Sequence, residues 1–374
     1  MGRKQMADKR QKGMRYFDYN LLLIVFFLIC FGLVVLYSSS AYKGQFVDEV
    51  GPAFYLKKQL NMDCIGIAVM LIVSRIDYRF WKKFWMIGYI ISLVLCFAVL
   101  FVGTELNGAK RWLKIGPISF QPSEIAKVAV ILFLATLVSH MKPKVIGDYR
   151  TILKLFVMLG LVIGCVVKEN LSTAVIICGI SVAILFVASP KYKQFFVMGG
   201  IVGVVGAVAV LAFGGYRAER IAIWLHPENY PKGFQTIQGL YAIGSGGLFG
   251  KGLGNGMQKL GFVPEAQNDM IFSIICEELG LFGAVCVILM FVILLWRFMI
   301  IANNAQDLFG ALVVTGVFAH IAIQVALNIA VVTNTIPNTG ISLPFISYGG
   351  TSVIILLAEI GLVLSVSRGI RLEG

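Results

Sequence analysis

The chain has 374 residues, of which 58% are hydrophobic and only 14% are charged, and its formal net charge is +13. A soluble domain of this composition would expose large apolar areas, so the composition excludes a soluble globular protein and favours one that has the bilayer as its solvent. Apolar runs recur at the length of roughly 20 residues that a helix needs to cross the hydrocarbon core of a membrane.

We therefore predict an all-α, polytopic membrane protein of about ten transmembrane helices. The long unbroken apolar runs favour helices over the alternating pattern of a membrane β-barrel. The first run is too long for a removable signal peptide and lacks a small-residue cleavage site, so we expect a permanent helix there. The predicted spans are 18–40, 57–74, 84–103, 122–140, 152–168, 172–189, 195–213, 270–296, 310–332 and 350–367.

Lysine and arginine set the expected orientation, because basic residues near short loops are retained on the cytoplasmic side of a membrane. More than half of the 32 basic residues lie on one side of the predicted helices, which places both termini in the cytoplasm. The net charge is thus a topology signal, and we expect no binding of nucleic acid. The clusters lie in the tail 1–16 and within 75–83, 142–154, 191–193 and 368–371.

We expect a single integral membrane domain over 1–374, since neither an internal repeat nor a low-complexity linker divides the chain. It includes the basic cytoplasmic tail, 1–16, and one long extracytoplasmic loop, 214–268, between helices seven and eight. The seven cysteines form no close pair and the three histidines lack zinc-ligand spacing. We therefore expect no metal held by protein side chains.

Three basic residues, Lys110, Arg111 and Lys114, lie on the translocated side, where the topology rule disfavours them. One interpretation is that they bind an anionic ligand such as a phosphate or pyrophosphate, because arginine makes paired contacts to oxyanions. The other is that they pair with lipid headgroups or extend from a helix end toward the membrane surface.

Glu124 and Lys127 follow in the first turns of the fourth predicted helix, three residues apart and therefore on one face. Ionisable groups at membrane depth usually face a cavity or the interior of a helix bundle. The pair is either a structural ion pair or part of a polar cavity that continues from Lys110 and Arg111.

The best candidate for chemistry is Asp269, at the junction of the long loop and the eighth helix. Partial burial would raise its pKa toward that of a usable base, whereas the helix dipole would lower it, and the residue could instead be a simple helix cap. Further candidates for substrate binding on this side are Arg220, Lys259, Glu265 and Ser347. Three acids lie deeper in predicted helices, as cavity-lining or structural groups: Glu277, Glu278 and Glu359.

Three segments of the chain resemble the SEDS family, named for shape, elongation, division and sporulation, and most closely its division branch. The segments are NGAKRWLKIGPISFQPSEIAK, QKLGFVPEAQNDMIFSIICEELG and LPFISYGGTS. They are long and correctly spaced, and the resemblance covers nearly the whole chain. One departure is Gln267-Asn268, which replaces the commoner His-Thr ahead of Asp269.

The resemblance implies a peptidoglycan glycosyltransferase that polymerises lipid II at the outer face of the cytoplasmic membrane. It implies Asp269 as the catalytic residue, and it matches Glu124, Lys127, Lys110 and Arg111 to the family's charged positions. Asp269 would deprotonate the 4-hydroxyl of a GlcNAc acceptor, which attacks the anomeric carbon of a MurNAc donor with inversion and releases undecaprenyl pyrophosphate. The expected partners are a class B penicillin-binding protein, which is a transpeptidase, other divisome membrane proteins and membrane lipids. The one cofactor expected is a divalent cation, Mg or Mn, on the pyrophosphate.

Two other classes of function stay open at this point. A lipid II transporter, or flippase, would use the same polar groups to move its substrate, although inverted repeats and paired broken helices are not evident in the sequence. A non-catalytic scaffold would only recruit the transpeptidase.

Overall fold

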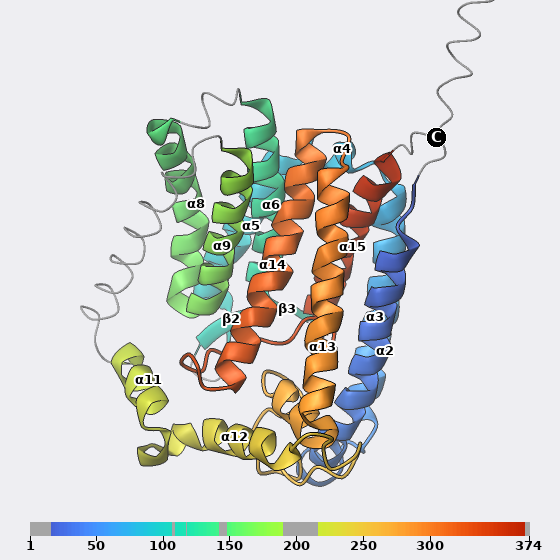
Figure 1. The fold of residues 1–374 in the computed structure, drawn as a ribbon. Helices are drawn as coiled ribbons and strands as arrows, with labels where there is room; N and C mark the ends of the chain where they lie inside the picture. Colours follow the sequence, from blue (N-terminus) through green and yellow to red (C-terminus); the bar gives the residue numbers. More distant parts are fainter. Residues whose placement is uncertain (1–15, 107–108, 117, 142–147, 190–215, 371–374) are drawn as a thin grey trace, which may run out of the picture.

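The structure is a computed structural model that describes residues 16–106, 109–116, 118–141, 148–189 and 216–370. These residues form a bundle of long helices, and a layer of short helices and irregular chain covers one end of it (Figure 1). The all-α, polytopic fold is thereby confirmed. The long helices are α2 (Tyr19–Tyr42), α3 (Phe54–Arg75), α5 (Trp85–Val102), α6 (Pro122–His140), α8 (Tyr149–Glu169), α9 (Leu171–Ala188), α13 (Ile271–Asn303), α14 (Leu308–Val332) and α15 (Thr351–Gly369).

These helices begin within a few residues of the predicted spans, and α6 matches its predicted bounds. Within the described residues, seven helices are long and apolar enough to cross a membrane, namely α2 with the turn that follows it, α5, α6, α9, α13, α14 and α15. The span expected at 195–213 lies outside the described residues, so the total of ten stays a prediction.

Short elements connect the long helices. They are the π-helical turn η1 (Lys43–Val47), α4 (Tyr78–Trp81), the strands β1 (Thr104–Leu106), β2 (Ala109–Ile115) and β3 (Ile118–Phe120), α11 (Tyr216–Leu225), the 3-10 turns η2 (Pro227–Asn229) and η3 (Pro231–Gly233), and α12 (Phe234–Gly246). The strands pair antiparallel in the order β1-β2-β3. Among its described residues, the segment expected as one long loop, 214–268, contains α11, the two 3-10 turns and α12. Irregular chain follows α12, from residue 247 to residue 268.

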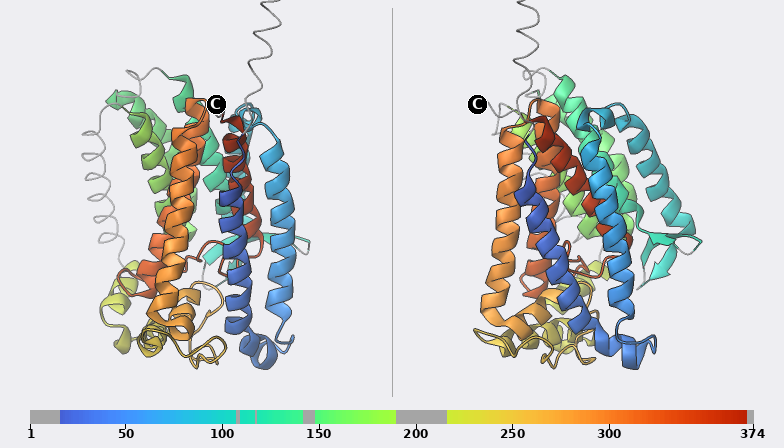
Figure 2. Two further views of the ribbon diagram at one scale, coloured as in Figure 1. Left: turned by 45° about the vertical axis from the view of Figure 1, so that its right-hand side comes forward. Right: turned by 90° about the vertical axis from the view of Figure 1, so that its right-hand side faces the viewer.

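The described chain ends meet at the end of the bundle opposite to α12 (Figure 2). The backbone N–H of Tyr16 donates to the carbonyl of Ile370 at 3.3 Å, and that of Asp18 donates to the hydroxyl of Ser367 at 3.4 Å. At the same end the buried carboxylate of Asp18 pairs with Arg297 at 2.6 Å. This agrees with the prediction that both termini lie on one side of the membrane.

Helix α14 lies inside the bundle and packs against α6, α9 and α13 (Figure 1). Both α6 and α14 bury most of their residues, whereas α5 and α13 expose a face of large apolar side chains. An exposed apolar face is what a bilayer requires of a spanning helix. Polar side chains on α14 therefore lie in the protein interior and not in lipid.

Candidate functional site

Asp269 lies immediately before α13, at the end of the bundle that carries α12. Its half-buried carboxyl accepts a hydrogen bond from the side-chain amide of Gln235 at 3.4 Å. Burial is the largest cause that raises the pKa of Asp269 to about 7, and the nearby carboxylate of Glu265 adds to it; hydrogen bonds from backbone N–H groups and from Gln235 oppose the rise. A carboxyl that titrates near neutrality is suited to accept a proton from a hydroxyl group.

Polar groups connect Asp269 to Arg220 on α11. The guanidinium of Arg220 donates to the carbonyl of Asn338 at 3.4 Å, and the side-chain amide of Asn338 donates to Gln235 at 3.2 Å. The predicted acid and one predicted cation therefore belong to one chain of contacts at the outer end of the bundle.

Glu265 lies in the turn that leads to Asp269, with a backbone φ of 55°. It accepts a hydrogen bond from the side-chain amide of Asn268 and pairs with Lys43 at 3.7 Å. Lys43 is a cation of this site that the sequence analysis missed. Lys43 lies in the first loop, on the translocated side of the membrane, where basic residues are disfavoured. This position was the signal in the sequence that could have found it.

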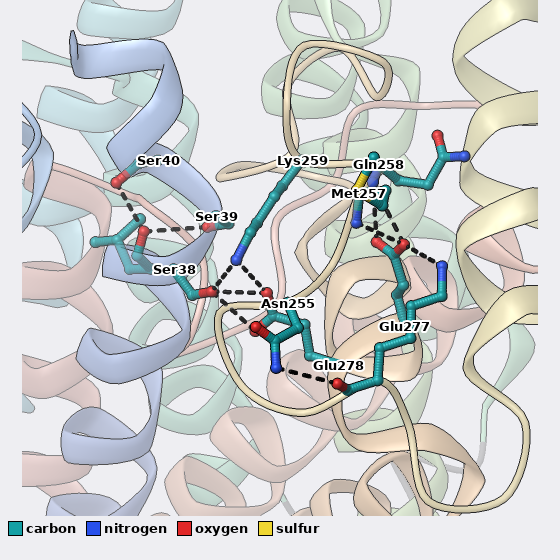
Figure 3. A network of polar contacts seen from close by, with 11 residues as sticks. Ser38, Ser39, Ser40, Asn255, Met257, Gln258, Lys259, Glu277 and Glu278 are labelled. Atoms are coloured by element: carbon teal, nitrogen blue, oxygen red, sulfur yellow. Dashed lines mark hydrogen bonds and ion pairs between the residues drawn. The ribbon is translucent and has the colours of Figure 1, made fainter.

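Lys259 is buried, and its ammonium faces inward (Figure 3). It pairs with the carboxylate of Glu278 on α13 and donates to the hydroxyl of Ser38 on α2 at 2.7 Å. A phosphate group would have to compete with Glu278 for this ammonium, so the contacts point to a structural role. The predicted role of Lys259 in substrate binding stays a prediction.

The neighbouring Glu277 holds the glycine-rich segment 247–263 against α13 (Figure 3). Its carboxylate accepts from the backbone N–H of Met257 at 2.9 Å and pairs with Lys251 at 2.8 Å. The close approach requires glycine at Gly280, because its φ is +67° and an added Cβ would lie 2.5 Å from the carbonyl oxygen of Leu248. These contacts assign Glu277 and Glu278 a structural role.

Ser347 is buried in the irregular segment before α15. Its hydroxyl donates to the carbonyl of Asn268 at 2.6 Å and accepts from the backbone N–H of Leu343 at 2.8 Å. The residue thus supports the turn that carries Asp269, while its predicted contact with substrate stays untested.

Glu124 and Lys127 form an ion pair at 2.8 Å, and the side chain of Lys127 is only 1% exposed. The same ammonium donates to Gln324 of α14 at 3.2 Å, and Gln324 lies 2.9 Å from a ring nitrogen of His320. The pair is therefore buried in the bundle interior and continues into a polar chain on α14. These contacts fit the structural ion pair, whereas the alternative, a polar cavity that continues from Lys110 and Arg111, stays a prediction.

The predicted basic loop forms the three-stranded antiparallel sheet β1-β2-β3. Lys110 and Arg111 lie in β2, where Lys110 is opposite Glu105 in the strand ladder. Arg111 lines a small pocket between α5, α6 and α8, together with Gln121 and Asn170. The sheet also contacts α15, because the hydroxyl of Thr351 donates to the carbonyl of Ser119 in β3 at 3.0 Å.

Several residues of this site were not singled out in the sequence. Gln324 and Asn328 of α14 are buried; Asn328 donates to the carbonyl of Asp269, and both amides donate to carbonyls of residues 341 and 342 in the segment before α15. Together with His320 they recur at intervals of four residues in an otherwise apolar helix, which was the signal that could have found them.

The described residues hold no group of three or more His, Cys, Asp or Glu side chains that could bind a metal ion.

Comparisons with known proteins match nearly the whole chain. Stage V sporulation protein E of Bacillus subtilis is 40% identical over 359 residues, which are 94% of this chain and 97% of that protein. A protein named probable peptidoglycan glycosyltransferase FtsW, from Trichlorobacter lovleyi, is 37% identical over 98% of both chains.

Solved structures of the same fold are also similar. A chain from a peptidoglycan synthase complex, described as coordinating polymerization and crosslinking, superposes with a TM-score of 0.81 at 26% identity, over 96% of this chain and 99% of that one. The rod shape determining protein RodA of Thermus thermophilus gives a TM-score of 0.70 at 26% identity, over 96% and 98% of the two chains.

The family model for cell cycle proteins of the FtsW, RodA and SpoVE type matches residues 19–371. This match and the apolar helices make the chain a multi-pass protein of the cytoplasmic membrane. With relatives at this identity and coverage, the chain belongs to the FtsW/RodA/SpoVE family of cell cycle proteins, which is the SEDS family.

Proposed function

We propose that this chain is a peptidoglycan glycosyltransferase that polymerises lipid II into glycan strands at the outer face of the cytoplasmic membrane during cell division. The observation that carries the proposal is the half-buried carboxyl of Asp269, whose pKa is raised to about 7. It lies at the outer end of the helix bundle, in a chain that belongs to this family. The name of one relative, probable peptidoglycan glycosyltransferase FtsW, supports the same activity.

In the proposed reaction Asp269 accepts the proton of the 4-hydroxyl group of a GlcNAc acceptor. The oxygen then forms a bond to the anomeric carbon of a MurNAc donor, the bond from that carbon to the pyrophosphate breaks, and the configuration is inverted. Undecaprenyl pyrophosphate leaves with the bonding electrons. Arg220, Lys110 and Arg111 are the cations that we propose to stabilise its developing negative charge.

We propose that a divalent cation, Mg or Mn, would bind together with the substrate and would supply positive charge to the leaving pyrophosphate. Chelation with EDTA is then expected to lower the initial rate of polymerisation, and excess Mg or Mn is expected to restore it. Rates measured on the purified protein check this. An unchanged rate in EDTA would show that the side-chain cations alone neutralise the leaving group.

The raised pKa of Asp269 predicts how the rate depends on pH. A base must be deprotonated, so the rate should fall about tenfold per pH unit below pH 7 and level off above it. Gln235→Ala removes a hydrogen bond that favours the charged form and should move the midpoint up, whereas Glu265→Gln removes a repelling charge and should move it down. Initial rates between about pH 5.5 and 8.5 check the prediction. A flat profile would rule out titration of Asp269 in the rate-limiting step.

We further propose that the partner is a class B penicillin-binding protein, with other divisome membrane proteins in the same assembly. The similar chain from a complex that coordinates polymerization and crosslinking supports a transpeptidase partner.

The decisive experiment is product analysis with lipid II and the purified protein in detergent, with and without the partner transpeptidase. Detergent abolishes sidedness, so a transporter leaves lipid II unchanged, whereas the proposed enzyme converts it into glycan strands. A scaffold would stimulate the transpeptidase and form no strands. Unchanged lipid II under every condition would overturn the proposal.

A further inference from the structure

The turn that carries Asp269 is fixed from outside its own segment. The backbone carbonyls of residues 267, 268 and 269 each accept a hydrogen bond from another part of the chain. The donors are, in order, the N–H of Tyr348 at 2.9 Å, the hydroxyl of Ser347 at 2.6 Å and the side-chain amide of Asn328 at 2.9 Å. Three successive peptide groups are thus oriented by α14 and by the segment before α15.

Asn328 contributes the most direct of these contacts, because its partner is the carbonyl of Asp269 itself. Its amide also donates to the carbonyl of Ile341 at 2.6 Å, and the side chain is fully buried. Its buried amide oxygen has no hydrogen-bond partner among the described residues. Leaving a buried acceptor unpaired is unfavourable, and the two hydrogen bonds that the amide nitrogen donates must offset this cost.

Asn328 is the last member of a polar row on one face of α14, with Gln324 and His320 four and eight residues before it. The amide nitrogen of Gln324 donates to the carbonyl of Ser342 at 3.1 Å, and its oxygen accepts from Lys127 at 3.2 Å. A carbonyl requires a donor and an ammonium requires an acceptor, so these two partners fix the orientation of the amide.

This orientation determines where the protons of His320 lie. Its Nε2 is 2.9 Å from the oxygen of Gln324, which accepts, so Nε2 carries a hydrogen. Its Nδ1 lies 2.7 Å from Glu359 Oε2, so the ring is held from both nitrogens. His320 and Lys127 both contact the amide oxygen of Gln324, so its amide nitrogen is directed to the carbonyl of Ser342. Asn328 holds the adjacent carbonyl of Ile341 and also that of Asp269, so the row acts on residues 341, 342 and 269.

We propose that Asn328, supported by Gln324 and His320 on the same face of α14, is the positioning residue that sets the orientation of the Asp269 carboxyl. The inference rests on the proposed function, in which Asp269 is the base. A displacement of about 1 Å at a reacting group can lower a rate roughly 10²-fold. Because Asn328 contacts backbone and not substrate, its loss should lower kcat and leave KM for lipid II unchanged.

The test measures kcat and KM for lipid II with the purified full chain and its partner transpeptidase. Asn328→Asp keeps the size and shape of the side chain, and Asn328→Leu is an uncharged, larger replacement; both remove the amide donors. The matched control is Asn304→Leu, because Asn304 also donates to a carbonyl, that of Ile300, at the opposite end of the bundle. We expect kcat to fall about 10²-fold in the Asn328 variants, with KM within about twofold, and to be unchanged in the control.

Ser347→Ala provides a second variant in case the Asn328 variants do not fold. It removes the donor at the carbonyl of Asn268, and we expect it to lower kcat without a change in KM, whereas loss of a substrate contact would raise KM. A kcat within about twofold of the unaltered protein, in any folded variant of Asn328, would overturn the inference.

Asp269→Asn in the same assay separates the two proposals. If Asp269→Asn polymerises normally, the base role fails and the inference fails with it. If Asp269→Asn is inactive while the Asn328 variants keep their kcat, only the inference is wrong.

Discussion

Asp269→Asn is expected to lower the rate of glycan polymerisation by roughly 10²- to 10⁴-fold, because an amide cannot accept the proton of the attacking hydroxyl group. Asparagine has the same shape as aspartate and can still accept the hydrogen bond from Gln235. Folding and membrane insertion should therefore be unaffected. Rates of strand formation from lipid II, at equal amounts of folded protein, provide the measurement.

Asp307→Asn is the matched control for this variant. Asp307 also precedes a long helix, α14, where it caps the backbone N–H of Gly310 at 2.8 Å and pairs with Arg79 at 2.7 Å. It lies at the cytoplasmic end of the bundle, and asparagine is also a good helix cap. We expect normal polymerisation in this control. Strand synthesis at the normal rate by Asp269→Asn itself would exclude Asp269 as the base.

Lys127→Met is expected to destabilise the protein by about 3–5 kcal/mol, the typical effect of breaking a buried ion pair by removing one partner. The carboxylate of Glu124 would remain buried without its cation, and the oxygen of Gln324 would lose a donor. Thermal unfolding of the purified protein in detergent, with the folded fraction followed by size-exclusion chromatography, measures the effect.

The double variant Glu124→Gln with Lys127→Met tests this physical reason. It removes both charges, so it should recover a large part of the lost stability, and the coupling between the two positions follows from the full double-mutant cycle. Additive effects of the two single variants would show that the ion pair at 2.8 Å contributes no coupling energy.

The helices are the part of the fold that the sequence predicted well. Hydropathy is a property of each short segment, so α6 could be predicted over 122–140 before any tertiary contact was known. The helices α11 and α12 were missed, because α11 has polar residues and α12 is too short and too rich in glycine to read as a spanning helix. The small three-stranded sheet was missed because β1 and β3 have only three residues each and β2 contains the charged residues that marked the segment as a loop.

In the candidate site, too, some features could be predicted from the sequence and others could not. Asp269, Glu124 and Lys127 could be found because a charge beside or within an apolar run is conspicuous in the sequence. The direction of Lys259, which turns inward to Glu278 and Ser38, could not be found, because it depends on how the segment 247–263 folds back onto α13 and α2.

The sequence by itself determined that this is a helical membrane protein with its termini on one side and a carboxyl group at the outer membrane boundary. Only the tertiary structure decided which groups hold that carboxyl, since the donors to residues 268 and 269 lie 79 and 59 residues away along the chain. The physical reason is that burial in lipid is imposed on each helix separately, whereas a buried polar group finds its partner only when the helices pack together.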